Sequence, residues 1–428
     1  MPALDAIFKA YDIRGTVPDQ LDEDVARRVG AAFARFAAED GAGRVLVARD
    51  MRPSGEALAG AFADGVRGQG LDVVDLGMAS TDLIYFAAGK LDAPGAMFTA
   101  SHNPAQYNGI KLCLAGARPV GQDTGLARIK ADAEAGLPPA ERRGSTSSQD
   151  VIGAYAEHVR SFADPKVLRP LRIVADTANG MGGLVAPAVF EGLPFDVEYL
   201  YPELDGTFPN HPADPIQAEN LRDLQALVVE RGELLSGSTT TAMVAKSILA
   251  KHPGETVLHN LICSKAVPEV VREHGGTPVR TKVGHSFIKQ VMLETGAVFG
   301  GEHSGHYYFR ENYRADSGLV ATMVVLEQLC AAAVPLSELL APLQRYADSG
   351  EINSTVSNPK AVIERVAEAH ADAEQDRLDG LTVDFGPWWF NLRPSNTEPL
   401  LRLNLEARTR EECDRHVDEV IDLIKKGA

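Results

Sequence analysis

The sequence predicts an α/β protein with three similar mixed α/β domains and a smaller C-terminal α+β domain. Two observations carry this prediction. A short apolar run that ends in a charge and leads into a helical stretch begins three times, near residues 44, 171 and 256. From about residue 352 the pattern changes to a few strands and one last helix. The three similar starts indicate a weak internal repeat.

The first domain is expected over residues 1–137 and alternates strands with helices. The helix after the first strand is predicted over 54–68, because Ser54 is a good N-cap and one face is apolar. That face carries Leu58, Phe62 and Val66. The strands are expected at 44–50, 71–76 and 96–100. A polar loop follows the last of them, where α/β sheets place ligand chemistry.

A polar, turn-rich stretch over 138–149 is predicted to link the first domain to the second. The other three domains are expected at 150–250, 251–347 and 350–428. Their predicted elements are strands at 171–176, 256–261, 383–392 and 400–407 and helices at 220–231 and 411–426. Val45 and Ile173 are 128 residues apart, whereas Ile173 and Val257 are only 84 apart. The second domain is therefore short.

The charge balance excludes some classes of partner. Lys and Arg total 42 and Asp and Glu total 59, which gives a net charge of −17. Such a chain repels polyanions at long range, so neither nucleic acid nor an anionic membrane is expected as a partner. No apolar run reaches the ~18 residues of a membrane span, and no basic leader precedes an apolar segment. A cytoplasmic location is the simplest expectation, and an anionic substrate would need a local basic pocket.

The four cysteines, Cys113, Cys263, Cys330 and Cys413, are scattered along the chain. They contain no C-x-x-C spacing, so the sequence indicates neither a zinc site nor a disulfide framework.

The strongest chemical motif is Thr99-Ala100-Ser101-His102-Asn103-Pro104, directly after a predicted strand. A serine at this place is a candidate nucleophile if a base or a metal ion activates it. Lys111 follows ten residues later. The alternative is an ordinary turn, since Ser and Asn-Pro are turn formers.

Three further segments add polar groups. Residues 393–399, RPSNTEP, combine a guanidinium, two hydroxyls and an amide, which suits a phosphate. Residues 300–306, GGEHSGH, place a carboxylate and a hydroxyl between glycines, where a carboxylate can accept two vicinal sugar hydroxyls. Residues 8–15, FKAYDIRG, set cations among apolar residues. Turns or strand bends remain the alternatives for the first two.

Together these four segments resemble the α-D-phosphohexomutase family, in its phosphomannomutase/phosphoglucomutase branch, in order over nearly the whole chain. The resemblance implies four domains around a central cleft, each supplying one loop. It implies an enzyme that interconverts hexose 1-phosphate and hexose 6-phosphate, of mannose, glucose or both. The active serine would carry a phosphoryl group, and the intermediate would be a 1,6-bisphosphate. Glucose 1,6-bisphosphate would act as activator.

The resemblance also assigns roles to individual residues. Ser101 would carry the phosphoryl group, with its phosphate as a metal ligand, and Lys111 would help proton transfer. The other implied catalytic residues are Arg14, His102 and His285. The implied substrate-binding residues are Tyr11, Lys282, Glu302, Ser304, Arg393, Ser395, Asn396 and Thr397. Lys9, Arg14, Lys111, Lys282 and Arg393 could form the basic pocket that the net charge calls for.

One family motif is absent. The family's second domain carries a loop of the form Asp-Gly-Asp-x-Asp-Arg, whose carboxylates hold Mg²⁺ together with the phosphoserine, and no such run occurs in the 428 residues. About twenty residues, the length of a strand-loop-strand piece, are missing from the second domain. Asp22 and Asp24 are the nearest D-x-D, but they are expected at the start of a surface helix. Mg²⁺ is therefore implied by the family without its usual ligands here.

Two other functions are compared with the mutase. The loss of the metal loop is expected to impair the mutase activity, and the alternative is an inactive protein that still binds sugar phosphates. A Ser-His hydrolase using Ser101 and His102 is disfavoured, because adjacent side chains rarely point at each other and no G-x-S-x-G elbow exists. The expected partners are hexose phosphates, and the expected oligomeric state is a monomer or a homodimer.

Overall fold

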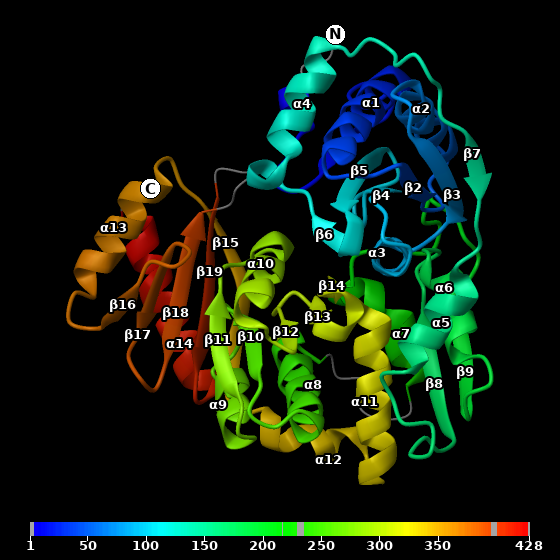
Figure 1. Cartoon of the computed structure of the whole chain (residues 1–428). Coiled ribbons are helices and arrows are strands. Elements are labelled where there is room, and N and C mark those ends of the chain that lie inside the picture. The colour runs from blue at the N-terminus through cyan, green and yellow to red at the C-terminus, as the bar shows by residue number, and fades with distance from the viewer. Residues whose placement is uncertain (1–3, 216, 229–234, 395–399, 427–428) are drawn as a thin grey trace. The chain divides into compact units, whose positions relative to one another are not determined.

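The computed structural model describes residues 4–215, 217–228, 235–394 and 400–426 (Figure 1). The chain forms two compact units. The first unit comprises residues 1–234 and 312–330, and the second comprises residues 235–311 and 331–428. The second unit is thus interrupted in sequence by a segment that belongs to the first.

The first domain is built on a mixed sheet of strand order β1-β5-β4-β2-β3-β7, with β6 paired to β5. Strands β2, β3, β4 and β7 run parallel, and β5 is antiparallel to both β1 and β4. The elements are β1 (Ile13–Thr16), α1 (Glu23–Glu39), β2 (Arg44–Arg49), α2 (Gly55–Gly68), β3 (Asp72–Met78), α3 (Thr81–Lys90), β4 (Gly95–Phe98), β5 (Tyr107–Leu114), β6 (Arg118–Pro119), α4 (Leu126–Ala135) and β7 (Thr146–Ser148).

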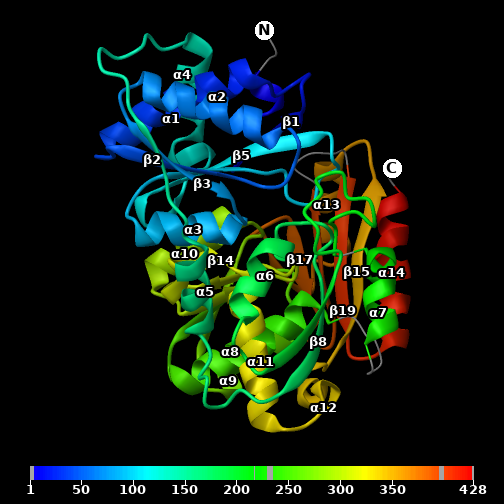
Figure 2. The ribbon, with the colours of Figure 1, turned by 90° about the vertical axis from the view of Figure 1, so that its right-hand side faces the viewer.

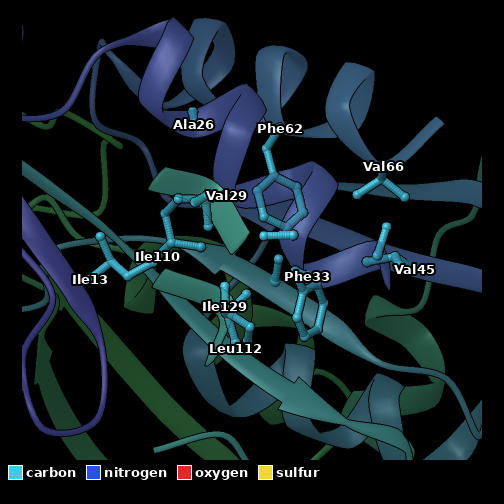
Figure 3. Packing of buried hydrophobic residues seen from close by; sticks show 14 of the residues in the cluster. Ile13, Ala26, Val29, Phe33, Val45, Phe62, Val66, Ile110, Leu112 and Ile129 are labelled. Atoms are coloured by element: carbon cyan, nitrogen blue, oxygen red, sulfur yellow. The ribbon is translucent and has the colours of Figure 1, made fainter. Parts of the chain in front are cut away.

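Helices α1, α2 and α4 bury their apolar faces against this sheet, and Phe33 and Phe62 lie at the centre of the cluster (Figure 3). The predicted apolar face of α2 is confirmed, because Leu58, Phe62 and Val66 are at most 2% exposed. Tight packing also explains Gly65, since a Cβ there would lie 2.0 Å from the carbonyl oxygen of Arg27 in α1. This core supports the strand ends from which the polar loops emerge.

Two local predictions in the first domain are wrong. Ser54 does not cap α2: its own backbone is helical, and its hydroxyl accepts a hydrogen bond from Asn108 Nδ2 at 2.9 Å. The end of the predicted linker is not a loop, because Thr146–Ser148 pairs with β3 as the edge strand β7. Asp22, by contrast, caps α1 by accepting from the Val25 amide, as its position at a helix start predicted.

The second domain has a sheet of two parallel strands, β8 (Leu171–Asp176) and β9 (Phe195–Leu200). Each residue of β8 is half-buried or exposed, although strands of parallel sheets are usually buried on both faces. The helices of this part are α5 (Ile152–Arg160), α6 (Gly182–Phe190) and α7 (Arg222–Leu227). A 3₁₀ turn over 218–221 precedes α7, so the predicted helix at 220–231 starts as a tighter turn, and its residues 229–231 lie outside the described chain.

The returning segment holds β14 (Ala315–Asp316) and most of α11 (Gly318–Ala332). It is bound to the first unit by polar contacts. The Glu327 carboxylate accepts from the Asp164 amide at 2.9 Å, and Ser317 Oγ donates to Asp82 at 2.8 Å. Tyr155 also donates to Asp82.

The second unit holds two sheets. The third domain has the strand order β11-β10-β12-β13, and the fourth has the antiparallel order β15-β19-β18-β17-β16. In the fourth domain α13 and α14 pack their apolar residues on the sheet (Figure 2). The elements are α8 (Gly237–Lys251), β10 (Thr256–Asn260), α9 (Ala266–Glu273), β11 (Thr277–Thr281), α10 (His285–Thr295), β12 (Phe299–Gly301), β13 (Tyr307–Phe309), α12 (Leu336–Leu340), β15 (Ala347–Thr355), α13 (Pro359–Ala369), β16 (Glu374–Asp376), β17 (Leu381–Asp384), β18 (Trp389–Pro394), β19 (Leu400–Ala407) and α14 (Arg410–Lys425).

The predicted strand at 383–392 is wrong as a single element. The chain forms a hairpin there, in which β17 pairs with β18 and Leu381 lies opposite Leu392. Gly386, with φ +85°, lies in the connection. Within the described residues no single helix is long and apolar enough to span a membrane, and one bent pair, 318–332 with 336–343, meets that test by length and composition only.

Candidate active site

The candidate serine lies in an exposed turn directly after β4. Ser101 has φ +54°, a left-handed conformation that few non-glycine residues adopt. Its amide donates to Thr99 Oγ1 at 3.0 Å, and its Oγ lies 3.5 Å from His102 Nδ1. The motif therefore forms a turn, as its turn-forming residues Ser and Asn-Pro indicated. This turn presents the serine hydroxyl to solvent.

Two cations reach this turn from β1 and β5. Arg14 donates to Asn103 Oδ1 at 2.5 Å and to Asp12 Oδ2 at 2.5 Å. Lys111 lies 3.4 Å from the same oxygen of Asp12. Because β1 and β5 are paired, with Arg14 opposite Gly109, the strand register brings the two cations together. Arg14 and Lys111 thus share one buried carboxylate beside the serine turn.

Burial lowers the pKa of the Lys111 ammonium, and the neighbouring Arg14 lowers it further, while Asp12 opposes both effects. A lysine with a lowered pKa gives up its proton more readily near neutral pH than a free lysine does. Lys111 is thus suited to exchanging a proton.

A cavity of about 440 Å³ lies beside the serine turn within the first unit. Asp50, Ser101 and His102 line it from the first domain, and Asp176 and His211 line it from the second. His211 Nε2 is 3.1 Å from Asp176 Oδ2. Nowhere in the part of the chain that the structure describes do three or more His, Cys, Asp or Glu side chains form a group that could hold a metal ion.

The candidate sugar-binding turn joins β12 to β13 in the second unit. Glu302 is only 2% exposed, and its carboxylate accepts from Tyr308 Oη at 2.7 Å, from Asn260 Nδ2 at 3.2 Å and from the Gly284 amide at 3.1 Å. Ser304 is exposed, with its Oγ 3.1 Å from His306 Nδ1. Glu302 is therefore held rigidly, and Ser304 is the more accessible of the two.

The candidate phosphate-binding arginine lies near the end of β18. Arg393 Nη2 donates to Glu351 Oε2 at 2.9 Å, and Arg402 reaches the other oxygen of Glu351 at 3.3 Å. Burial lowers the pKa of Arg393, and Glu351 partly opposes this effect. Two guanidinium groups again share one carboxylate. Ser395, Asn396 and Thr397 lie outside the described residues.

The other predicted residues are more dispersed. Tyr11 is 39% exposed, and Lys9 Nζ donates to the carbonyl oxygen of Ala6 at 2.7 Å. Lys282 Nζ lies 5.6 Å from the ring centroid of Phe287. His285 is the first residue of α10, and its side chain lies outside what the structure describes. The structure thus groups Arg14, Ser101, His102 and Lys111 in the first unit, and the roles of all these residues stay predictions.

Three residues of the serine site have no role predicted from the sequence: Asp12, Arg52 and Thr99. Asp12 is the carboxylate between the two cations, and Thr99 orients the Ser101 amide. Arg52 is 1% exposed and donates to backbone carbonyls of the serine turn. The segment Arg49-Asp50-Met51-Arg52 carries no signal for this role, because the carbonyl acceptors of Arg52 lie 49 to 55 positions away.

Comparison with known proteins agrees with this architecture. Family models described as phosphoglucomutase/phosphomannomutase match all four parts of the chain, as α/β/α domain I at residues 5–137, domain II at 153–238, domain III at 236–346 and the C-terminal domain at 351–423.

Relatives match over almost their whole lengths. The phosphohexose mutases of Xanthomonas campestris pv. campestris are 41% identical over 432 residues, covering 94% of this chain and 95% of theirs. A phosphomannomutase of Salmonella montevideo is 38% identical, covering 94% of each chain. The crystal structure of a phosphoglucomutase/phosphomannomutase family protein from Burkholderia thailandensis superimposes with a TM-score of 0.89 at 34% identity, covering 100% of this chain and 99% of that one.

The fold and the comparisons therefore define an isomerase that transfers phosphoryl groups of hexose phosphates. The chain belongs to the phosphoglucomutase/phosphomannomutase family and is a phosphohexomutase, an isomerase of carbohydrate metabolism. The comparisons give no support to the alternative of an inactive sugar-phosphate-binding protein. The family is magnesium-dependent.

Proposed function

We propose that this chain interconverts the 1- and 6-phosphates of mannose, glucose or both through phosphorylated Ser101. The observation that carries the proposal is the exposed Ser101 turn, which Arg14 holds through Asn103 at 2.5 Å, next to Lys111. Phosphoryl transfer depends mainly on positioning and on neutralising the phosphate charge. A held serine with the cationic side chains of Arg14 and Lys111 beside it meets both needs.

The transfer has two mirrored halves. A free hydroxyl of the hexose phosphate attacks the phosphorus of phosphoserine 101, the bond between Ser101 Oγ and phosphorus breaks, and a 1,6-bisphosphate forms. The proton lost by the sugar hydroxyl goes to a base, and Ser101 Oγ takes up a proton. The bisphosphate then turns over and returns its other phosphoryl group to Ser101. Lys111, with its lowered pKa, is our candidate for proton exchange at Ser101.

The residues of this chain do not fit the family's magnesium site, and we derive no step through that ion. The carboxylate loop is absent from the sequence, and no substitute group of ligands occurs among the described residues. One observation supports a deletion in the second domain: among its described residues the sheet has two strands, and every residue of β8 is half-buried or exposed.

Two substrate-level proposals go with this one. Glucose 1,6-bisphosphate would activate the enzyme by phosphorylating Ser101. Glu302, Ser304 and Arg393 would bind the sugar hydroxyls and the phosphate that does not react. The two guanidinium groups of Arg393 and Arg402, which share Glu351, support the second point.

The proposal is tested by incubating the purified chain with glucose 1,6-bisphosphate and measuring its intact mass. We expect a species heavier by about 80 Da, the mass of one phosphoryl group, in the native chain and not in Ser101→Ala. A coupled assay then measures conversion of mannose 1-phosphate and glucose 1-phosphate to their 6-phosphates. Absence of the heavier species together with absence of turnover would refute the proposal.

A further inference from the structure

We propose that Arg52 positions the Ser101 turn for phosphoryl transfer. Arg52 also links this turn to segment 205–208 of the second domain, so the packing of that segment affects the position of Ser101. This inference rests on the proposed function for its catalytic consequence. Arg52 itself touches neither the serine hydroxyl nor a substrate, so it would act as a positioning residue.

Arg52 uses every N–H of its guanidinium group. Nη2 donates to the carbonyl oxygens of Ser101 at 2.9 Å and Asn103 at 2.7 Å. Nη1 donates to those of Pro104 at 2.8 Å and Tyr107 at 2.9 Å. The fifth donor of the guanidinium group, Nε, lies 3.2 Å from Asp50 Oδ2. Four carbonyl groups of one turn are therefore directed at a single side chain.

This arrangement needs an arginine. The side chain of Arg52 is 0% exposed, so each of its donors must find an acceptor inside the protein. Burial lowers the pKa of Arg52, and Asp50 opposes this effect. The planar fork of five donors matches the five acceptors, whereas a lysine has three donors at a single point. A lysine would leave carbonyls of the turn without partners.

The same contacts account for the unusual backbone of the serine. A left-handed residue other than glycine costs free energy and persists only where its surroundings fix it. Ser101 has φ +54°, and Arg52 binds its carbonyl oxygen directly. Without Arg52 the turn would relax, and the serine hydroxyl would lose its fixed direction.

The second domain contacts Arg52 from the other side. A Cβ on Gly206 would lie 2.6 Å from the Arg52 Cα, so the two backbones touch. The guanidinium carbon of Arg52 lies 5.1 Å from the ring centroid of Phe208, within the range of a cation–π interaction. Phe208 also lines the cavity that contains Ser101. Segment 205–208 is therefore joined to the serine turn through one residue.

The test compares Arg52→Lys with Arg160→Lys. Arg160 makes similar contacts to carbonyls, at 2.8 Å to Ala188 and 3.3 Å to Val189, and takes no part in the serine turn. We expect Arg52→Lys to lower kcat about 100-fold, as a displacement of about 1 Å can, while KM for hexose 1-phosphate changes less than threefold. Arg160→Lys is expected to keep kcat within twofold.

Hydrogen exchange of the unphosphorylated proteins tests the turn separately from catalysis. Amides of Ser101, Asn103 and Tyr107 are hydrogen-bonded within the turn, and we expect exchange over 101–107 to be at least tenfold faster in Arg52→Lys and unchanged in Arg160→Lys. Unchanged exchange, or equal losses of kcat in both variants, would overturn the role of Arg52. If the native chain is not phosphorylated at Ser101, the proposed function and the catalytic consequence fail together, and exchange still decides the positioning.

Discussion

At the scale of single residues, a carboxylate shared by two cations occurs in each of the two compact units. Asp12 lies between Arg14 and Lys111, and Glu351 lies between Arg393 and Arg402. In both places two cations meet one anion. A chain with a net charge of −17 needs local groups of cations to bind anionic substrates. The two pairs of cations meet this need.

Asp12 should control the pH dependence of turnover. Its charge raises the pKa of Lys111 against the larger effect of burial. Asp12→Asn removes that charge, so the pKa of Lys111 falls. The limb of the kcat–pH profile that depends on ionisation of Lys111 should therefore move to lower pH. The profile is measured with the coupled assay. Asp40→Asn, which removes the exposed partner of Arg118, should leave the limb in place. A limb at the same pH in both variants would contradict the assignment of Lys111.

His259 should make the second unit sensitive to acid. Burial lowers its pKa to about 4 from an ordinary value of 6.5. The unfolded chain therefore takes up a proton first as the pH falls, so stability is lost between about pH 6.5 and pH 4. Between pH 7 and pH 5 the expected loss from this histidine is about 2 kcal/mol.

His259→Asn should remove most of this pH dependence, which urea unfolding at pH 7 and pH 5 would measure. His274 is exposed, so His274→Asn should behave as the native protein does. An unchanged pH dependence in His259→Asn would show that other groups cause the loss.

At the scale of elements, the docking of segment 205–208 offers a second test of the serine turn. Gly206→Ala places a Cβ 2.6 Å from the Arg52 Cα and 3.0 Å from the Met51 carbonyl oxygen, so backbone must move. We expect kcat to fall roughly tenfold, since misplacement of a reacting group weakens catalysis steeply. Gly153→Ala is the control, because nothing lies within 4 Å of its Cβ. Equal kcat values in the two variants would contradict the coupling.

Elements with a clear period were predictable, and contacts between elements were not. The apolar face of α2, the strand at β8 and the last helix follow from local pattern. The hairpin of β17 and β18 was predicted as one strand, although Gly386-Pro387 in its connection is a turn signal. Ser54 has the chemistry of an N-cap, yet its partner is Asn108, a residue 54 positions away.

The same difference applies to the site. Ser101, Lys111 and Arg14 were identified from motifs and a family resemblance. Arg52 was not, since its role exists only when four carbonyl groups of another loop turn toward it. The shared carboxylate of Asp12 likewise depends on the register of β1 and β5.

At the scale of the whole molecule, the two compact units should unfold as separate transitions in calorimetry. Their apolar clusters are distinct, with Phe62 in the first unit and Phe390 in the second, both 0% exposed. Replacing a buried Phe by Ala costs about 3–5 kcal/mol. Phe62→Ala should lower one transition and Phe390→Ala the other. If both variants lowered the same transition, or only one transition appeared, the units would not be independent.

The proposed lack of the family's magnesium site can also be tested on the whole chain. With the ligand loop absent, Mg²⁺ should raise the melting temperature of the unphosphorylated chain by no more than the same concentration of Ca²⁺ does. Thermal unfolding over a titration of each ion measures this. A saturable rise specific to Mg²⁺ would reveal a site that the described residues do not contain.

The return of residues 312–330 to the first unit has a consequence for synthesis on the ribosome. Glu327 binds the Asp164 amide and Ser317 binds Asp82, so the first unit lacks these contacts until residue 327 has left the exit tunnel. By then residues 235–311, the first part of the second unit, are already outside. An N-terminal unit usually completes its folding before the next unit begins to fold. This chain cannot follow that order. Translation speed between residues 235 and 330 should influence its yield.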